Sequence, residues 1–248
     1  TNFRHSKLNT MKRLLILVSA LASLTVLGQG TNPAQKISIG FNFSPDYSFR
    51  TIKNNDGSPS SNLVIKNRND IEVAKFGYTT GLTVCFNFSK LVGIETGIQF
   101  SNKGYKTKNQ DLIYFPPSPG SPTKAKTRES YQYIGIPIKA KLSFGKGKVR
   151  FLSSIGFMTS FLLNVKHTIN LEYSNGNSEK ETQSTTSGFK NVDISPMLSV
   201  GIDYKLNNKI HLLAEPTFRY GVLITRDVPV TENLWSAGLN IGINYVLK

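Results

Sequence analysis

Alternation of apolar and polar residues over unusually long stretches is the feature of this sequence that most limits its fold. From Phe76 to Phe88, apolar or aromatic side chains occupy every second position except Thr80, with small or polar residues between them. A period of two indicates a β-strand with one apolar face. Seven alternating positions, six of them apolar or aromatic, exceed the usual strand of a soluble sandwich and suit a strand that crosses a bilayer.

The same alternation recurs along the chain and predicts eight strands, an even number. Single-chain outer-membrane barrels have even strand numbers, so we predict an all-β fold, a transmembrane antiparallel up-and-down β-barrel of about eight strands. The predicted strands cover residues 36–44, 76–88, 92–101, 134–144, 149–165, 192–206, 210–224 and 235–247. Pro137, Pro196 and Pro216 fall inside three of them, where proline predicts bulges or strand ends.

The connections between these strands alternate in length, which is the most specific signal. Short turns at residues 89–91, 145–148 and 207–209 alternate with long, polar segments at 50–75, 102–130 and 167–191. Long outer loops and short inner turns are typical of outer-membrane barrels. A soluble ligand-binding barrel has no reason to separate its connections by length in this way.

Composition and charge exclude two other classes of protein. Mean hydropathy is −0.20, and only the N-terminal stretch approaches the ~20 apolar residues of a membrane helix, so a multi-helix membrane protein is excluded. The net charge of +15 invites a nucleic-acid interpretation. The basic residues lie mostly in predicted loops and turns, however, which favours a solvated rim near anionic lipid headgroups and no nucleic-acid partner.

The N-terminal region has the layout of an export signal. Met11-Lys12-Arg13 is followed by an almost entirely apolar stretch up to Leu27 and by Gly28. A charged start, an apolar core and a small-residue cleavage site predict a signal peptide, and the core is short for a retained anchor helix. We expect residues 1–10 to be an upstream extension, 11–28 a cleaved signal peptide, and 29–248 the barrel domain of the outer membrane.

Residues capable of catalysis or metal binding are few and scattered. Cys85 is the sole cysteine, so a disulfide within the chain is impossible and a cysteine-based zinc site is disfavoured. His5, His167 and His211 are too dispersed to predict a metal site. His167 is the one plausible member of a catalytic triad. We therefore predict a protein that is not an enzyme, with no cofactor and no catalytic, cofactor-binding or metal-binding residues.

Two groups of residues are candidates for a structural or functional role. Charged residues of both signs fall on the lumen side of the strands, where charges removed from water need partners, so we predict a structural ionic network rather than a proton or ion path. That network comprises Glu95, Lys139, Lys141, Arg150, Asp203, Glu215 and Arg219. Aromatic and basic residues of the segment 102–130 form the second group, as binding residues or as a merely solvated loop. They are Tyr105, Lys106, Tyr114, Phe115, Lys124 and Arg128.

Two segments give the chain a family resemblance. Residues 94–105 (IETGIQFSNKGY) and 131–139 (YQYIGIPIK) resemble strands of the PorT-like outer-membrane β-barrel proteins of Bacteroidetes-type bacteria. The resemblance covers nearly all of the chain after the signal peptide. The resemblance implies a β-barrel fold and a location in the outer membrane. One member of the family serves protein secretion, so the resemblance also raises that role. Fold alone does not fix a task.

Together these patterns predict a non-enzymatic outer-membrane β-barrel whose long extracellular loops bind a partner or join a cell-envelope or secretion assembly. The alternative is a narrow outer-membrane channel for small solutes. The expected partners are outer-membrane lipid and either envelope or secretion proteins or an anionic glycan. We expect the barrel to be monomeric.

Overall fold

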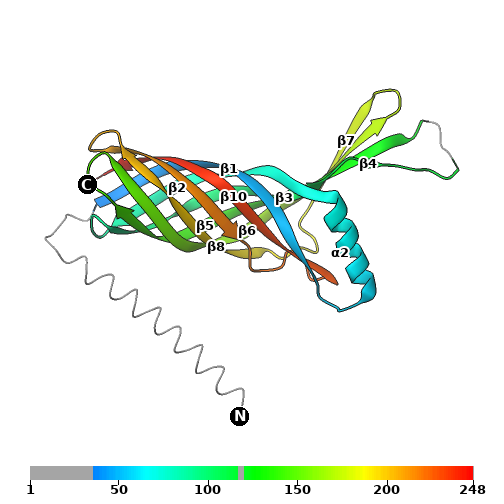
Figure 1. Cartoon of the computed structure of the whole chain (residues 1–248), viewed down its shortest axis with the longest axis horizontal. Coiled ribbons are helices and arrows are strands. Elements are labelled where there is room, and N and C mark those ends of the chain that lie inside the picture. Colours follow the sequence, from blue (N-terminus) through cyan, green and yellow to red (C-terminus); the bar gives the residue numbers. More distant parts are fainter. Residues whose placement is uncertain (1–35, 117–119, 248) are drawn as a thin grey trace, which may run out of the picture.

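The computed structural model describes residues 36–116 and 120–247, with Lys36 described by its backbone alone. Within these residues, eight long antiparallel strands close into a ring, and Figure 1 shows them as an elongated barrel. The ring contains β1 (Lys36–Asn54), β2 (Glu72–Asn87), β3 (Val92–Thr107), β5 (Pro122–Phe144), β6 (Val149–Tyr173), β8 (Val192–Lys205), β9 (Ile210–Tyr220) and β10 (Val230–Val246). The predicted upstream extension and signal peptide, 1–10 and 11–28, lie outside the described residues.

Each ring strand pairs with the ring strand before it and the one after it, and β1 closes the ring by pairing with β10. That closing ladder runs from Ser38 opposite Val246 to Asn54 opposite Val230. A closed antiparallel ring leaves no unpaired edge facing lipid, as a spanning barrel requires. The predicted fold class is confirmed. The one helix of the described residues, α2 (Pro59–Ile71), is too short to cross a membrane.

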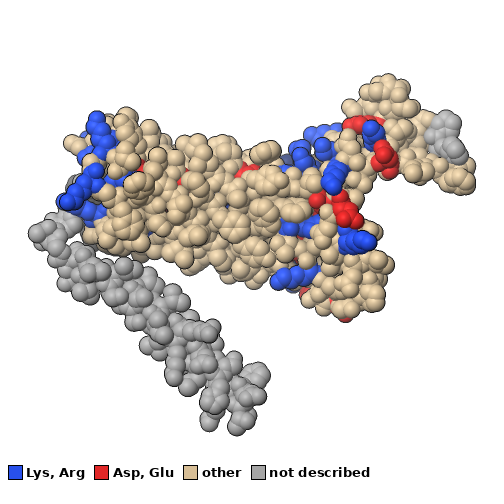
Figure 2. Space-filling model, viewed as in Figure 1, with Lys and Arg blue, Asp and Glu red and all other residues tan. Residues whose placement is uncertain are grey.

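The alternation in the sequence becomes two chemically different faces of the wall. On β8, Leu198 points outward with 55% of its surface exposed, whereas Ser195 and Ser199 are buried in the lumen. Figure 2 shows the middle of the outer surface almost free of charged side chains, with charges gathered at the two ends. An apolar band between polar ends is the surface that a bilayer requires.

Strands approach closely in this narrow barrel. A Cβ added at Gly156 would lie 2.1 Å from the backbone oxygen of Ile138 on the neighbouring strand. Only glycine permits that approach, because any side chain would force β5 and β6 apart.

The short connections lie together at one end, the inner end, and have the predicted positions. The turn after β2 is fixed by Ser89 Oγ, which accepts from the backbone N–H groups of Leu91 and Val92. Asn207 Oδ1 does the same for Lys209 and Ile210 in the turn after β8. The turn after β5 uses Gly145 and Gly147, both with positive φ. Short polar side chains and glycines favour such tight turns.

Aromatic rings mark the opposite, outer end of the apolar band. Trp235 packs against Tyr47, Phe49 and Phe218, with ring centroids 6.2–6.5 Å apart. Tyr47 also contacts Phe76 on β2 at 5.9 Å. Aromatic side chains favour the membrane–water interface, so this group places the outer interface at the level of Trp235.

The prediction of bulges or strand ends at the three prolines was wrong for two of them. Opposite Pro137, the β3–β5 register passes from Thr96–Ile138 to Gln99–Gly135 without a shift. The β8–β9 register likewise stays constant on either side of Pro216, and only Pro196 lies where that ladder ends. The local gap in pairing accommodates the missing N–H group, so the strand need not bulge.

The outer connections are more ordered than predicted. Segment 50–75 contains the end of β1 and the helix α2, whose N-cap Ser58 accepts a hydrogen bond from the backbone N–H of Ser61. Segments 102–130 and 167–191 are largely strands rather than loops. They include the short strands β4 (Gln110–Asp111) and β7 (Ser178–Thr185).

These strands build a second structure above the barrel, visible at the upper right of Figure 1. The hairpin of β5 and β6 continues past the ring as far as Pro122 opposite Tyr173. β4 pairs with the free side of β5, and β7 pairs with β6 from Val165 to Glu172. We call the structure formed by β4, residues 122–128, residues 165–173 and β7 the projecting sheet.

Candidate functional site

Six of the seven predicted lumen charges form two separate clusters. Lys139 Nζ lies 2.5 Å from Glu95 Oε1 and 3.9 Å from Glu215 Oε2, and Lys141 Nζ lies 3.3 Å from Glu95 Oε2. Nearer the inner end, Arg150 pairs with Asp203, which also lies 2.9 Å from Nδ1 of His211. All seven predicted residues except Arg150 are buried.

Arg219, the remaining predicted member, joins a third cluster nearer the outer end. Its Nη1 lies 3.3 Å from Asp46 Oδ1, and Ser44 and Thr79 donate hydrogen bonds to the same carboxylate. Above it, Lys103 Nζ lies 3.0 Å from Asp193 Oδ2 and over the ring of Tyr133. The sequence pattern placed Lys103 in an outer loop; the structure buries it in the lumen because β3 continues to Thr107.

Aromatic side chains close the lumen at its outer end. Tyr131 is 1% exposed and packs edge-on against Phe189, with ring centroids 5.6 Å apart. The buried cluster comprises Tyr105, Tyr131, Tyr133, Val165, Phe189 and Leu234. Phe189 enters it from the connection between β7 and β8, so an outer segment folds back into the barrel mouth. This layer separates the lumen from the outside.

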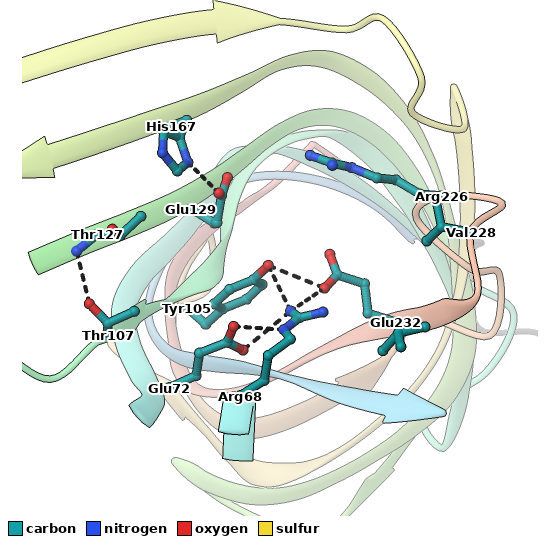
Figure 3. Close-up of a pocket in the computed structure, with 11 residues that line it drawn as sticks. Arg68, Glu72, Tyr105, Thr107, Thr127, Glu129, His167, Arg226, Val228 and Glu232 are labelled. Carbon is teal, nitrogen blue, oxygen red and sulfur yellow. Dashed lines mark hydrogen bonds and ion pairs between the residues drawn. The ribbon is translucent and has the colours of Figure 1, made fainter. Parts of the chain in front are cut away.

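A charged network centred on Glu232 covers this aromatic layer. Arg68, in the last turn of α2, lies 2.7 Å from Glu72 and 2.8 Å from Glu232. Arg68 Nη2 also donates to the hydroxyl of Tyr105 at 3.0 Å. Figure 3 shows these four side chains converging inside the ring. The helix is thereby fixed over the barrel mouth by charge-assisted hydrogen bonds.

Three hydroxyl groups donate hydrogen bonds to Glu232 in addition to Arg68. Tyr105 and Tyr131 donate to its two oxygens at 3.2 and 2.5 Å, and Thr225 donates at 3.0 Å. Burial raises the pKa of Glu232, but the hydrogen bonds from Arg68 and Tyr131 outweigh that effect and hold its pKa below the ordinary value. The carboxylate lies three residues beyond Trp235, on the outer side of the aromatic interface, and stays ionised at neutral pH.

An open cavity of about 340 Å³ lies around this network. Besides Arg68, Glu72, Tyr105 and Glu232, its walls include Thr107, Thr127, Glu129, His167, Arg226, Val228 and Val230. We call it the rim cavity. Figure 3 shows His167 and Arg226 on opposite sides of it. Arg226 stacks on the ring of Phe189 at 3.7 Å, and its Nε has no hydrogen-bond partner among the described residues.

His167, the histidine singled out from the sequence, pairs with Glu129 across the β5–β6 hairpin. Its Nδ1 lies 2.5 Å from Glu129 Oε1. A histidine held by a carboxylate resembles two-thirds of a catalytic triad, which also needs a nucleophile. Of the hydroxyl and thiol side chains, the described cavity is lined by those of Tyr105, Thr107 and Thr127. Its chemistry is that of a polar binding surface with two arginines and three carboxylates.

The predicted binding residues divide into three groups. Tyr105 is buried in the aromatic layer, so its assignment to an exposed loop was wrong, and Lys106 is half-buried on β3. Lys124 and Arg128 are exposed on the projecting sheet. Tyr114 and Phe115 lie at the end of that sheet, beside Ile113. Ile113 and Phe115 are 91% and 99% exposed.

Sequence reasoning missed Arg68, Glu232, Phe189 and Arg226. Each lies in a segment without a period-two pattern or beyond the end of a predicted strand. Glu232 carried a weak signal, because it lies three positions before Trp235, and tryptophan favours the membrane–water interface. For the other three, the contacts depend on how separate connections fold toward one another.

The comparison with protein families agrees with the architecture. The family described as "Outer membrane protein beta-barrel domain" matches residues 29–223. No curated protein sequence matches the chain. The solved structures similar to it include OprG from Pseudomonas aeruginosa, at 13% identity and a TM-score of 0.42, covering 88% of this chain and 98% of that one.

Two further solved structures are similar to the chain at the same distant level. Neisserial surface protein A has 12% identity and a TM-score of 0.41, covering 84% of this chain and 96% of that one. The outer membrane protease OmpT from Escherichia coli has 8% identity and a TM-score of 0.35, covering 87% and 99%. Likenesses at this level carry no argument about activity. The family match spans most of the sequence, and the chain therefore belongs to the outer membrane protein beta-barrel domain family and is a β-barrel protein of the outer membrane.

Proposed function

We propose that this chain is a non-enzymatic binding protein of the outer membrane that engages a protein partner through the projecting sheet. The observation that carries the proposal is the pair of apolar side chains at the end of this sheet, Ile113 and Phe115, which are almost fully exposed to water. Both lie well beyond the aromatic interface, so lipid does not cover them.

The projecting sheet is suited to present these side chains at a distance from the membrane. β5 and β6 stay paired from the barrel out to Pro122 and Tyr173, and β4 joins them next to the exposed residues. A rigid scaffold that carries recognition residues at its end loses little conformational freedom on binding. The eight residues of β7 are all exposed, and its outer edge is unpaired among the described residues.

The chemistry of the end of the sheet favours a protein over a glycan. Large aliphatic and aromatic side chains form the centre of protein interfaces, where they fill pockets on the partner. Close to them lie Tyr114 and the basic residue Lys124, and Arg128 lies further along β5 toward the barrel; polar and basic residues suit the rim of such an interface. An aliphatic residue such as Ile113 offers nothing specific to a sugar.

Photo-crosslinking on intact cells tests the proposal. A photoreactive amino acid replaces Phe115, and the same amino acid replaces Leu63, which is 64% exposed on α2, as the matched control. We expect a discrete protein adduct from position 115 and none from position 63. The adduct should disappear in the variant Ile113→Ser. Folding of the barrel, measured by the change in gel mobility on heating, should stay the same.

Three outcomes contradict the proposal. Equal adducts from both positions would show indiscriminate proximity to other surface proteins. An adduct from position 63 alone would move the binding surface to α2. A diffuse product that glycosidase treatment removes would identify a glycan as the occupant.

The narrow channel is the alternative, and the geometry gives it less support. The aromatic layer and the network of Glu232 cover the outer end of the lumen, and paired charges fill its middle. Planar-bilayer recordings distinguish the two functions: we expect no stable conductance, and a stable single-channel step of any size would favour the channel.

A further inference from the structure

A second cavity lies at the opposite, inner end of the barrel, among the short turns. Its volume is about 470 Å³. The lining residues come from all three turns and the adjacent strand ends: Asn87, Ser89, Lys90, Gly145, Lys146, Gly147, Arg150, Lys205, Asn208, His211 and Val246. We call it the inner mouth. It shares no residue with the rim cavity or the projecting sheet.

The inner mouth is strongly basic. Lys90, Lys146, Arg150 and Lys205 line it together with His211, and its lining residues include no Asp or Glu. Figure 2 shows the corresponding concentration of basic side chains at the left end of the barrel, where acidic ones are nearly absent. Clefts lined by one sign of charge focus the field and attract ions of the opposite sign.

Most of this positive charge has no internal partner. Among the described residues, Lys90, Lys146 and Lys205 form no ion pair within 4.0 Å. Arg150 does pair with Asp203, but its Nε is buried and lacks a hydrogen-bond partner there. A guanidinium group that lines a basic cavity can donate hydrogen bonds to an incoming oxyanion.

The backbone that carries these cations is held by the turns. The side chains of Ser89 and Asn207 accept hydrogen bonds from the backbone N–H groups of Leu91 and Lys209, and Gly145 and Gly147 shape the third turn. Three rigid turns therefore present cations from three sides of one opening.

We infer that the inner mouth is a binding site for a small anion that carries phosphate groups. Phosphate offers several oxygens to several donors at once, which matches the arginine and the three lysines around one cavity. The cavity volume falls within the range of small-ligand sites, about 300–1,000 Å³. A phosphate group could come from a soluble molecule or from a lipid headgroup.

The position of the cations favours a ligand inside the opening. Side chains at this level that point away from the lumen are apolar and exposed, including Phe88, Phe144 and Leu206. Lipid would contact that outer surface, whereas Lys90 and Lys146 line the cavity itself. The same turns carry Lys148 and Lys209, which are exposed and do not line it. These two residues supply a matched control.

The test titrates inorganic pyrophosphate into the protein in nanodiscs of neutral phosphatidylcholine. Calorimetry measures affinity, and NMR follows the side-chain Nε–H signal of Arg150. We expect saturable binding that shifts this signal and weakens as salt screens the charges. The double variant Lys90→Gln/Lys146→Gln should weaken binding about tenfold, whereas Lys148→Gln/Lys209→Gln should change it less than about twofold.

A second arm identifies the source of the phosphate. In nanodiscs that contain phosphatidylglycerol, unchanged pyrophosphate binding indicates a soluble ligand, and loss of binding with a shifted Arg150 signal indicates that the headgroup occupies the site. Either result supports the site. Absence of a shift in the Arg150 signal in both membranes overturns the proposed site. Equal weakening of binding by both double variants also overturns it, because it would show only diffuse attraction to a basic end of the barrel.

Discussion

The same two strands, β5 and β6, pass through two regions with opposite burial patterns. Within the membrane, β5 alternates between buried lumen residues such as Lys139 and exposed apolar ones such as Ile138. In the projecting sheet, residues 166–171 of β6 are all half-buried with no alternation, and the neighbouring β7 is exposed at all eight positions. The backbone pairing is continuous across both regions. A strand therefore forms without alternation of apolar and polar residues. Such alternation shows only that the two faces of the strand meet different environments.

The largest expected effect concerns buried charge in the wall. Glu95→Ala removes the carboxylate that neutralises Lys139 and Lys141, so we expect the free energy of unfolding to fall by about 3–5 kcal/mol. Glu181→Ala, on the projecting sheet, should change it by less than about 0.5 kcal/mol. Denaturant unfolding in lipid vesicles measures both. Similar values for the two variants would break the contrast between the regions.

The lipid-facing surface should show the next largest effect. Leu198→Arg places a charge in the middle of the apolar band and should destabilise the folded barrel by about 2–4 kcal/mol. Ser178→Arg, at the start of β7 and opposite Glu172, should be within about 0.5 kcal/mol of the unchanged protein. Folding yield into vesicles is the measurement. An unchanged yield for Leu198→Arg would mean that this face does not contact lipid.

The junction between the two regions should respond to acid through Glu232. Its pKa is lowered in the folded protein, so its carboxylate stabilises the fold above the ordinary value of 4.5, and this stabilisation is lost as pH falls through the lowered pKa. Glu232→Gln should therefore be destabilising by about 1–3 kcal/mol at pH 7.

The pH dependence separates this effect from a simple loss of packing. The difference in unfolding free energy between the Glu232→Gln variant and the unchanged protein should shrink as pH falls below 4.5. Paired unfolding curves between pH 7 and 3 measure it. A difference that stays constant over this range would show that ionisation of Glu232 contributes nothing.

The smallest effect should come from shortening the end of the projecting sheet. Replacing residues 112–121 with a short Gly/Ser linker keeps β4 and β5 joined and should change barrel stability by less than about 0.5 kcal/mol. Co-purification of the protein partner from outer membranes, which by our proposal depends on Ile113 and Phe115, should be lost. Failure of the shortened chain to fold would show that this segment belongs to the barrel's own stability.

The sequence predicted the wall well because lipid and lumen impose different residues on alternating positions. The three inner turns and the eight ring strands follow directly from that constraint. The outer ends of β3, β5 and β6 were missed, since Lys106, Lys124 and His167 have water or polar neighbours on both faces. No pattern in composition separates such a strand from a polar loop.

The candidate site was predictable only in part. Phe115 and Lys124 were identified because aromatic and basic residues cluster in one segment, and both are exposed. Tyr105 was misplaced because its strand is longer than the alternation suggests. The contact of Arg68 with Glu232 joins residues 164 positions apart, and such a pair leaves no local signal in one sequence.

Hydrogen exchange in lipid bilayers tests most directly the central claim that β5 and β6 leave the membrane as one continuous folded hairpin. The account predicts slow exchange for the paired amides of residues 132–143 and measurable, though weaker, protection for the paired amides of residues 124–128 and 166–172. Complete exchange of the outer amides at the earliest time point, with the barrel amides still protected, would contradict it and restore the two segments to flexible loops.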